Sequence, residues 1–201
     1  MKRRPLIIGL TGSIGMGKST AAKVLSGFGL PVHNADAAVH ALLSPGSAAV
    51  KPVARLFPNA LKRGGIDRAL LGKEVFGAPK KLKELEGILH PLVGKKEREF
   101  LRRAQKDRAP AVVLDIPLLF ETGAEARCDV TLCVTASKIV QKERVLKRHG
   151  MDAARFRAIL KQQMPDKEKR SRADFVINTS KGMADTKRQL AAFWIVLQEG
   201  E

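Results

Sequence analysis

The chain has 201 residues, of which 44% are hydrophobic and 28% charged, enough for one compact α/β domain with an inserted subdomain. Its net charge of +17 favours a polyanionic ligand such as a nucleotide, a phosphorylated small molecule or a nucleic acid, although a solvated basic surface gives the same balance. No apolar run approaches the roughly 18 residues of a membrane span, and the stretch after the basic start is too short for a secretory signal, so we expect a cytoplasmic protein.

The cysteine, histidine and aromatic residues argue against a disulfide, a metal site and nucleic-acid binding. Cys128 and Cys133 lie in a segment that alternates like a strand, and we expect small core residues rather than a bridge or a metal pair. The four histidines are scattered without ligand spacing, which argues against a zinc site. With no tyrosine and only 4% aromatics, the chain lacks the stacking platforms of single-strand binders, so we expect no nucleic-acid partner.

Apolar runs alternate with helical patterns along the chain, which predicts a parallel sheet with crossover helices. The expected strands are 5–11, 30–33, 111–115, 130–134 and 174–177. We expect a first helix over 19–27 and a last one over 184–198. Further helices should follow the N-caps Ser137 and Asp152, with Gly150 ending the former.

About 75 residues between the second and third strands contain no convincing strand, far more than one crossover helix needs. We interpret residues 36–110 as a helical insertion, suited to holding a second substrate. It reads as several helices, with a turn at "RGG" and a long basic helix from Pro91 to about Asp107. The prolines are expected in first turns, where the missing N–H costs nothing.

The segment "GSIGMGKS" fits the pattern GxxxxGKS through Gly12, Gly17, Lys18 and Ser19. It follows a buried strand and opens a helix, the context in which glycines turn amide N–H groups toward phosphates. Lys18 can then reach the β and γ oxygens, and Ser19 can ligate Mg²⁺. Because no NKxD segment for guanine appears and the chain is short for an oligomeric ATPase, a small-molecule kinase is favoured.

Two aspartates follow predicted strands, where an acceptor would approach. Asp36 could accept the proton of an attacking hydroxyl, or could merely cap the next helix. Asp115 follows four apolar residues, as a Walker B carboxylate does; it could hold Mg²⁺ through water or contact substrate, or could be a plain strand-end residue.

A basic region covers residues 138–170. Arg144 and Arg148 lie four apart in "QKERVLKRHG" and therefore share a helix face. Arginines on a closing lid can offset the charge of a transferring phosphoryl group, although a solvated basic face remains open.

Over nearly its whole length the chain resembles the dephospho-CoA kinase family. The resemblance rests on "GLTGSIGMGKST", "NADAAVH", "LEGILHPLV", "LDIPLLFE", "QKERVLKR" and "ADFVINTS" in this order. It implies an α/β, three-layer P-loop NTPase fold with a five-stranded parallel sheet, a helical substrate-binding insertion and a lid. In a single domain, residues 1–35 and 111–201 would be the nucleotide-binding core, 36–110 the CoA-side insertion and 138–170 the lid region.

The implied reaction is transfer of the ATP γ-phosphate to the ribose 3′-hydroxyl of dephospho-CoA, the last step of coenzyme A synthesis, with Mg²⁺ accompanying ATP. Asp36 matches the family's candidate base, and Lys18 and Arg144 complete the catalytic set. The substrate side would be Asp36, His90 and Asp115, and Ser19 would hold the metal. ATP would be bound by Gly12, Ser13, Ile14, Gly15, Met16, Gly17, Lys18, Ser19, Thr20 and Arg148.

The chain departs from the family pattern at three positions. Asn34 replaces the usual first aspartate of the DAD segment, which removes a charge near the acceptor, while Ser13 and Met16 replace a common glycine and serine at variable loop positions. Another small-molecule kinase and a basic nucleotide-dependent nucleic-acid-binding protein are the rival hypotheses. No heptad or exposed apolar stripe indicates an interface, which favours a monomer.

Overall fold

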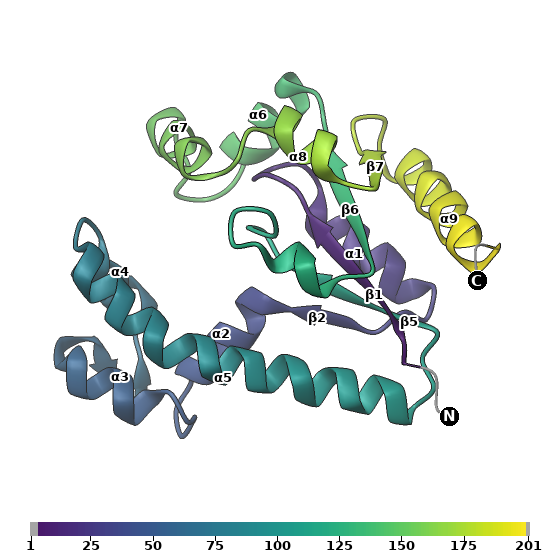
Figure 1. The fold of residues 1–201 in the computed structure, drawn as a ribbon. Helices are drawn as coiled ribbons and strands as arrows, with labels where there is room; N and C mark the ends of the chain where they lie inside the picture. Colours follow the sequence, from purple (N-terminus) through teal and green to yellow (C-terminus); the bar gives the residue numbers. More distant parts are fainter. Residues whose placement is uncertain (1–3, 200–201) are drawn as a thin grey trace. The chain divides into compact units, whose positions relative to one another are not determined.

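The computed structural model describes residues 4–199 (Figure 1). They form two compact units, one from the residues up to Val32 together with those from Ala104 onward, and one from His33 to Arg103. Within the described range, no helix is both long and apolar enough to cross a membrane.

The main sheet has five strands in the order β2-β5-β1-β6-β7, all of which belong to the first unit except the last two residues of β2. Its strands are β1 (Leu6–Thr11), β2 (Val32–Asn34), β5 (Ala111–Asp115), β6 (Val130–Thr135) and β7 (Phe175–Asn178). β1 pairs in parallel with β5 and β6, and β6 pairs in parallel with β7. All five strands predicted from the sequence are confirmed, with small shifts at their ends, because long apolar runs are typical of buried parallel strands.

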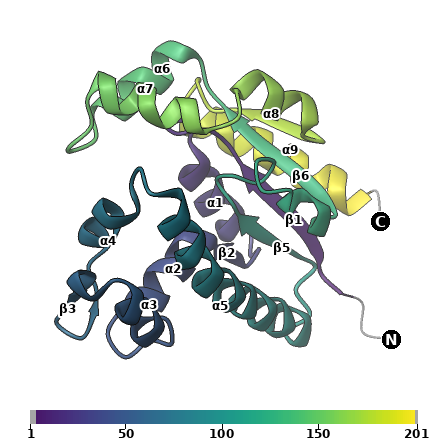
Figure 2. The same cartoon turned by 60° about the vertical axis from the view of Figure 1, so that its left-hand side comes forward.

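The helices of the first unit are α1 (Lys18–Gly27), the 3-10 helix η2 (Ala124–Arg127), α6 (Lys138–Leu146), α7 (Ala153–Gln162), α8 (Asp166–Arg172) and α9 (Met183–Glu199). Four of them, α1, α6, α7 and α9, were predicted from the sequence, whereas η2 and α8 were not. Helices α6 and α7 lie beyond the carboxyl end of β6, whereas α8 packs against this strand (Figures 1 and 2).

Helices and loops cover both faces of β1. Ile8 and Leu10 are fully buried in an apolar core shared with α1 and α9. Gly9 points the other way, where a Cβ would lie 2.7 Å from Cys128 Sγ and 3.1 Å from Leu119 Cδ2. This second face is covered by the chain that follows β5 and, over the neighbouring strand β6, by α8. Both sheet faces are therefore closed around the strand that leads into the glycine-rich loop.

The helix caps in the basic region were predicted in part. The side chains of Ser137 and Asp152 accept hydrogen bonds from the N–H groups of Val140 at 3.3 Å and Arg155 at 2.7 Å, which confirms both N-caps. The expectation that Gly150 ends the helix is wrong: α6 ends at Leu146, and the chain leaves it through short turn hydrogen bonds. Gly150 instead has φ +71° in the turn before α7.

The second unit is mainly helical, with its own apolar core. Its elements are α2 (Ala35–Leu43), α3 (Val50–Leu56), η1 (Pro58–Ala60), β3 (Leu61–Lys62), β4 (Gly65–Ile66), α4 (Arg68–Val75) and most of α5 (Pro79–Lys106). The core is formed by apolar side chains of α2, α3, α4 and α5, among them Val53, Phe57 and Leu71.

The "RGG" turn joins two short antiparallel strands, β3 and β4, so the expectation of no strand in this segment is wrong. Arg63 and Gly64 have φ +49° and +78°. Two consecutive left-handed residues are typical of the tight hairpin turn that matches strand twist. A two-residue strand is too short to leave an apolar periodicity in the sequence.

Helix α5 runs without interruption through Pro91, so the expectation that a helix begins at Pro91 is wrong. A proline inside a helix removes the bond to the carbonyl four residues earlier, here that of Gly87. Gly87 is exposed, so water can bind that carbonyl. Leu85 and Leu89 pack into the core before the proline, and Leu92 does so after it. Packing on both sides therefore outweighs the lost hydrogen bond.

Candidate phosphoryl-transfer site

Residues 12–17 form the loop between β1 and α1. Gly12, Gly15 and Gly17 have positive φ angles of 154°, 79° and 89°. At Gly15 a Cβ would also lie 2.6 Å from Val145 Cγ2, so only glycine fits there. Gly17 precedes α1, and no side chain caps this helix. The first amide N–H groups and the positive end of α1 are therefore available to an anion.

Lys18 and Asp115 form an ion pair at the sheet edge. Lys18 is the first residue of α1, and its Nζ contacts Oδ1 of Asp115, the last residue of β5. The side chains are 14% and 1% exposed. Asp115 is in register with Leu10 of β1, so strand pairing itself brings the carboxylate beside the loop. A bound polyphosphate would compete with Asp115 for the Lys18 ammonium.

The other loop positions divide between packing and exposure. Ser13 and Met16 are buried, and the Met16 N–H donates to the Ser13 carbonyl at 3.1 Å. Ser19 is exposed and Thr20 is half-buried, and neither hydroxyl has a hydrogen-bond partner among the described residues. These two oxygens are therefore free to bind a cation or a phosphate.

Arg144 is linked to the loop through Thr179, a residue that the sequence did not indicate. Its Nη1 donates to Thr179 Oγ1 at 2.8 Å and its Nη2 donates to the Thr179 carbonyl at 2.7 Å. The Thr179 hydroxyl donates in turn to the Met16 carbonyl at 2.9 Å. Thr179 follows β7 and touches Gly17, where a Cβ would lie 2.9 Å from its hydroxyl. The signals in the sequence were its place two residues after the predicted strand 174–177 and within the segment "ADFVINTS".

Arg148 lies one turn beyond Arg144, just after the end of α6. It is exposed, and its guanidinium has no hydrogen bond or ion pair among the described residues. The two arginines therefore differ: Arg144 is hydrogen-bonded to Thr179, which contacts the loop, whereas Arg148 is available to bind a ligand.

Asp36 lies in the first turn of α2, within the second unit. The N-cap of this helix is Asn34, whose Oδ1 accepts from the Ala37 N–H at 2.7 Å. The alternative that Asp36 caps the helix is therefore wrong. Its side chain is exposed and has no partner among the described residues. The capping role also accounts for an asparagine at position 34, because asparagine and aspartate are equally good N-caps.

His90 belongs to the same unit, on α5 directly before Pro91. It is exposed, and it makes no hydrogen bond with Asp36. Asp36 and His90 both belong to the second unit. Contacts within the first unit join the phosphate loop to Lys18, Asp115 and Arg144.

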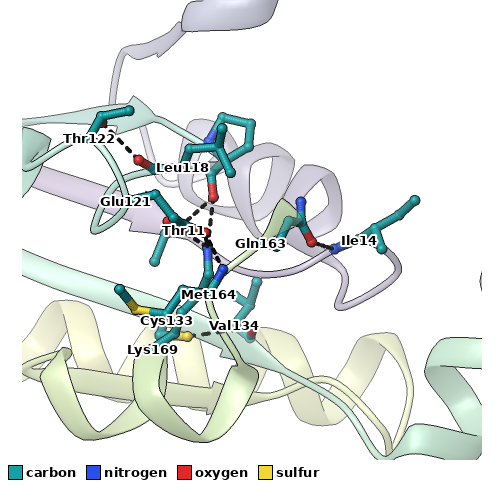
Figure 3. A network of polar contacts seen from close by, with 11 residues as sticks. Thr11, Ile14, Leu118, Glu121, Thr122, Cys133, Val134, Gln163, Met164 and Lys169 are labelled. Carbon is teal, nitrogen blue, oxygen red and sulfur yellow. Dashed lines mark hydrogen bonds and ion pairs between the residues drawn. The ribbon is translucent and has the colours of Figure 1, made fainter. Parts of the chain in front are cut away.

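A buried ion pair supports the first unit's side of the site, and the sequence did not predict it (Figure 3). Lys169 of α8 is fully buried, and its Nζ lies 2.8 Å from Oε1 of Glu121. The same Nζ donates to the Pro117 carbonyl at 3.0 Å. The Thr11 hydroxyl donates to that carbonyl at 3.1 Å, directly before the loop begins. The pair thus connects α8 to the strand end that carries the loop.

Comparison with known proteins agrees with this geometry. A sequence model described as dephospho-CoA kinase matches residues 6–185. A dephospho-CoA kinase of Rhizobium meliloti (strain 1021) is 52% identical over 195 residues, which cover 97% of this chain and 100% of the relative. The chain belongs to the dephospho-CoA kinase family. It is therefore a phosphotransferase of the P-loop kinase class.

Solved structures agree with this assignment to the dephospho-CoA kinase family. A crystal structure from Thermus thermophilus has a TM-score of 0.86 at 39% identity and covers 98% of each chain. Dephospho-CoA kinase from Campylobacter jejuni has a TM-score of 0.72 at 27% identity, covering 96% of this chain and 98% of its own. Shikimate kinase from Bacteroides thetaiotaomicron, at 16% identity and a TM-score of 0.50, shares the fold alone.

Proposed function

We propose that this dephospho-CoA kinase family member transfers the γ-phosphoryl group of ATP to the 3′-hydroxyl of dephospho-CoA, giving coenzyme A and ADP. The observation that carries the proposal is the uncapped start of α1, a cradle in which amide N–H groups and the positive helix end lie beside the Lys18 ammonium and suit a triphosphate. Family membership supplies the acceptor, and the cradle supplies the donor site.

Asp36 acts as the base for the attacking hydroxyl. Support comes from its exposed carboxylate, which no helix cap or ion pair among the described residues occupies. A general base must reach the hydroxyl by hydrogen bond, and an unengaged carboxylate can do so. Residues 36–110 hold the acceptor, with His90 on the same unit available as a substrate contact.

Lys18, Arg144 and Arg148 offset the charge of the transferring group. Lys18 and Arg144 are already held beside the loop, which favours positioning over large rearrangement. Arg148 is exposed and engages the nucleotide when residues 138–170 act as a lid. Phosphoryl transfer depends mainly on such positioning and charge compensation.

Mg²⁺ fits the oxygen donors at the start of α1. Mg²⁺ binds through one or two protein oxygens together with phosphates and water. Ser19 has an uncommitted hydroxyl, and Asp115 supplies a carboxylate at the same sheet edge. No group of three or more His, Cys, Asp or Glu side chains suited to a metal occurs within residues 4–199. The bound metal would neutralise phosphate charge, while Ser19 and Asp115 hold their oxygens toward it.

The proposed setting is a cytoplasmic monomer that uses ATP and dephospho-CoA and binds neither nucleic acid nor membrane. The first test measures ADP release with ATP and Mg²⁺ in the presence of dephospho-CoA, of other nucleosides and nucleotides, and of no acceptor, with product masses. A gain of one phosphate on dephospho-CoA alone supports the proposal. Turnover only with another acceptor contradicts the substrate, and steep salt-dependent binding to nucleic acid without acceptor-dependent turnover favours the rival class.

A further inference from the structure

One residue of the phosphate loop, Ile14, is held on both sides of its Cα by two glutamines of the lid region 138–170. The Ile14 N–H donates to Oε1 of Gln163 at 3.0 Å, and Nε2 of Gln141 donates to the Ile14 carbonyl at 2.8 Å. Gln141 is a buried residue of α6, and Gln163 directly follows α7. Figure 3 shows the Gln163 amide pointing at Ile14. The two ends of the segment 141–163 therefore meet on a single loop residue.

Glutamine suits this place for a chemical reason. The backbone of a residue offers one N–H donor and one carbonyl acceptor, and a neutral side-chain amide can satisfy either. Ile14 lies between Gly12 and Gly15, so the loop backbone there is free to turn unless a side chain holds it. A carboxylate would repel a bound polyphosphate and an ammonium would bind it, whereas glutamine fixes the backbone without adding charge.

Gln163 is itself held by the buried ion pair. The N–H of its neighbour Met164 donates to Oε1 of Glu121 at 2.8 Å, and Glu121 is paired with the fully buried Lys169. The Lys169 ammonium also bonds the Pro117 carbonyl, which accepts from Thr11 immediately before the loop. These contacts begin at Thr11 and end at Ile14, three residues further along the chain. They therefore tie both sides of the start of the phosphate loop to the same network.

We propose that Gln141 and Gln163 are positioning residues for phosphoryl transfer, which act through the backbone N–H and carbonyl of Ile14 and make the conformation of the phosphate loop depend on the lid region 138–170. The inference rests on the proposed kinase function and deepens it. By holding Ile14, the two glutamines keep the loop amides oriented before ATP binds, so less ordering is needed in the transition state.

The test uses Gln163→Met and Gln141→Met, with Gln162→Met as the matched control, since Gln162 is an exposed neighbour. Loss of one positioning hydrogen bond is expected to lower kcat about fivefold to tenfold in either variant, with KM for dephospho-CoA within about twofold of wild type. The double variant should lose less than the two single losses combined, because both bonds restrain the backbone of the same residue, Ile14. A kcat within about twofold of the control in both variants overturns the inference.

Substitution by glutamate separates positioning from a structural role. Gln163 accepts its bond, so Gln163→Glu keeps the contact and should keep kcat near wild type, while repulsion of bound ATP raises KM for ATP. Gln141 donates its bond, so Gln141→Glu loses the contact and its kcat should fall as in Gln141→Met. Equal kcat losses in the two glutamate variants would overturn the inference.

ADP affinity gives a readout that needs no acceptor. Titration with ADP and Mg²⁺ should show weaker binding in Gln163→Met and Gln141→Met than in Gln162→Met, by about threefold or more. If wild-type protein forms no product from dephospho-CoA, the proposed function is contradicted. The ADP titration still decides the inference, because equal ADP affinities in the three variants refute it.

Discussion

Replacing Lys169 by methionine tests the buried pair behind the phosphate loop. The substitution removes a fully buried ammonium together with its bonds to Glu121 and the Pro117 carbonyl. It leaves the Glu121 side chain, only 17% exposed, without its cation and held by the Met164 N–H alone. Breaking a buried pair in this way costs about 3–5 kcal/mol. We therefore expect Lys169→Met to be strongly destabilising.

The expected loss corresponds to a fall in Tm of about 6–20 °C, since about 1 kcal/mol shifts Tm by about 2–4 °C at this chain length. Thermal and urea unfolding, followed by circular dichroism, measure it. Lys167→Met is the control, because Lys167 is an exposed residue of the same helix. The double variant Glu121→Leu/Lys169→Met should recover much of the loss, since it leaves no unpaired charge. A Tm for Lys169→Met within about 2 °C of the control would refute the reasoning.

Four further results are expected. Lys18→Ala should lower kcat about tenfold or more, and it should also lower Tm because Asp115, 1% exposed, loses its counter-ion; steady-state kinetics and thermal unfolding separate the two effects. Asp36→Asn should lower kcat about tenfold or more with an unchanged Tm, since the side chain is exposed; full turnover in this variant removes Asp36 from the base role. EDTA should abolish ADP formation and Mg²⁺ should restore it, as an acceptor-dependent ADP assay can show. Burial, with the nearby Asp166 carboxylate, raises the pKa of the Cys133 thiol to about 12. At pH 8 a thiol reagent should therefore modify the half-buried Cys128 of the native protein and leave Cys133 unmodified. Rapid labelling of both cysteines would contradict the burial of Cys133.

The same Cys133 shift has a defined sign for stability. Its pKa rises from 9.0 to about 12 in the folded chain, so the native state holds the proton more tightly than the unfolded state. The contribution to the free energy of unfolding is complete below pH 9 and is lost as the pH rises toward 12.

The sheet and the phosphate loop could be predicted from the sequence because their signals are local. Each buried parallel strand is one apolar run, and residues 12–20 carry the loop, its lysine and the helix start in consecutive positions. The positions of the strand end, the glycines and the lysine relative to one another therefore follow from adjacent residues in the sequence. Asp115 required one long-range step, the pairing of β5 with β1.

The supporting contacts could not be predicted, because they join residues far apart in the sequence. Lys169 is one of several cations in "DKEKRSR", and nothing in that stretch marks it as the buried one. Its burial depends on Glu121, 48 residues earlier. Gln141 and Gln163 reach Ile14 across 127 and 149 residues. Pro91 was misjudged for a related reason: core packing on both sides decides whether a helix continues through a proline.

The basic region 138–170 therefore contains cations in three different states rather than one charged surface. Lys169 is neutralised in a buried pair, Arg144 is bound to Thr179, and Arg148 is exposed without a partner among the described residues. Salt screens exposed charges far more than buried ones. Raising the ionic strength should thus weaken nucleotide binding through cations such as Arg148, while the loop support built on Lys169 persists. The net charge suggested a polyanionic ligand but did not show which cations bind it. The structure separates the exposed cations, which can bind a ligand, from the paired ones, which support the loop.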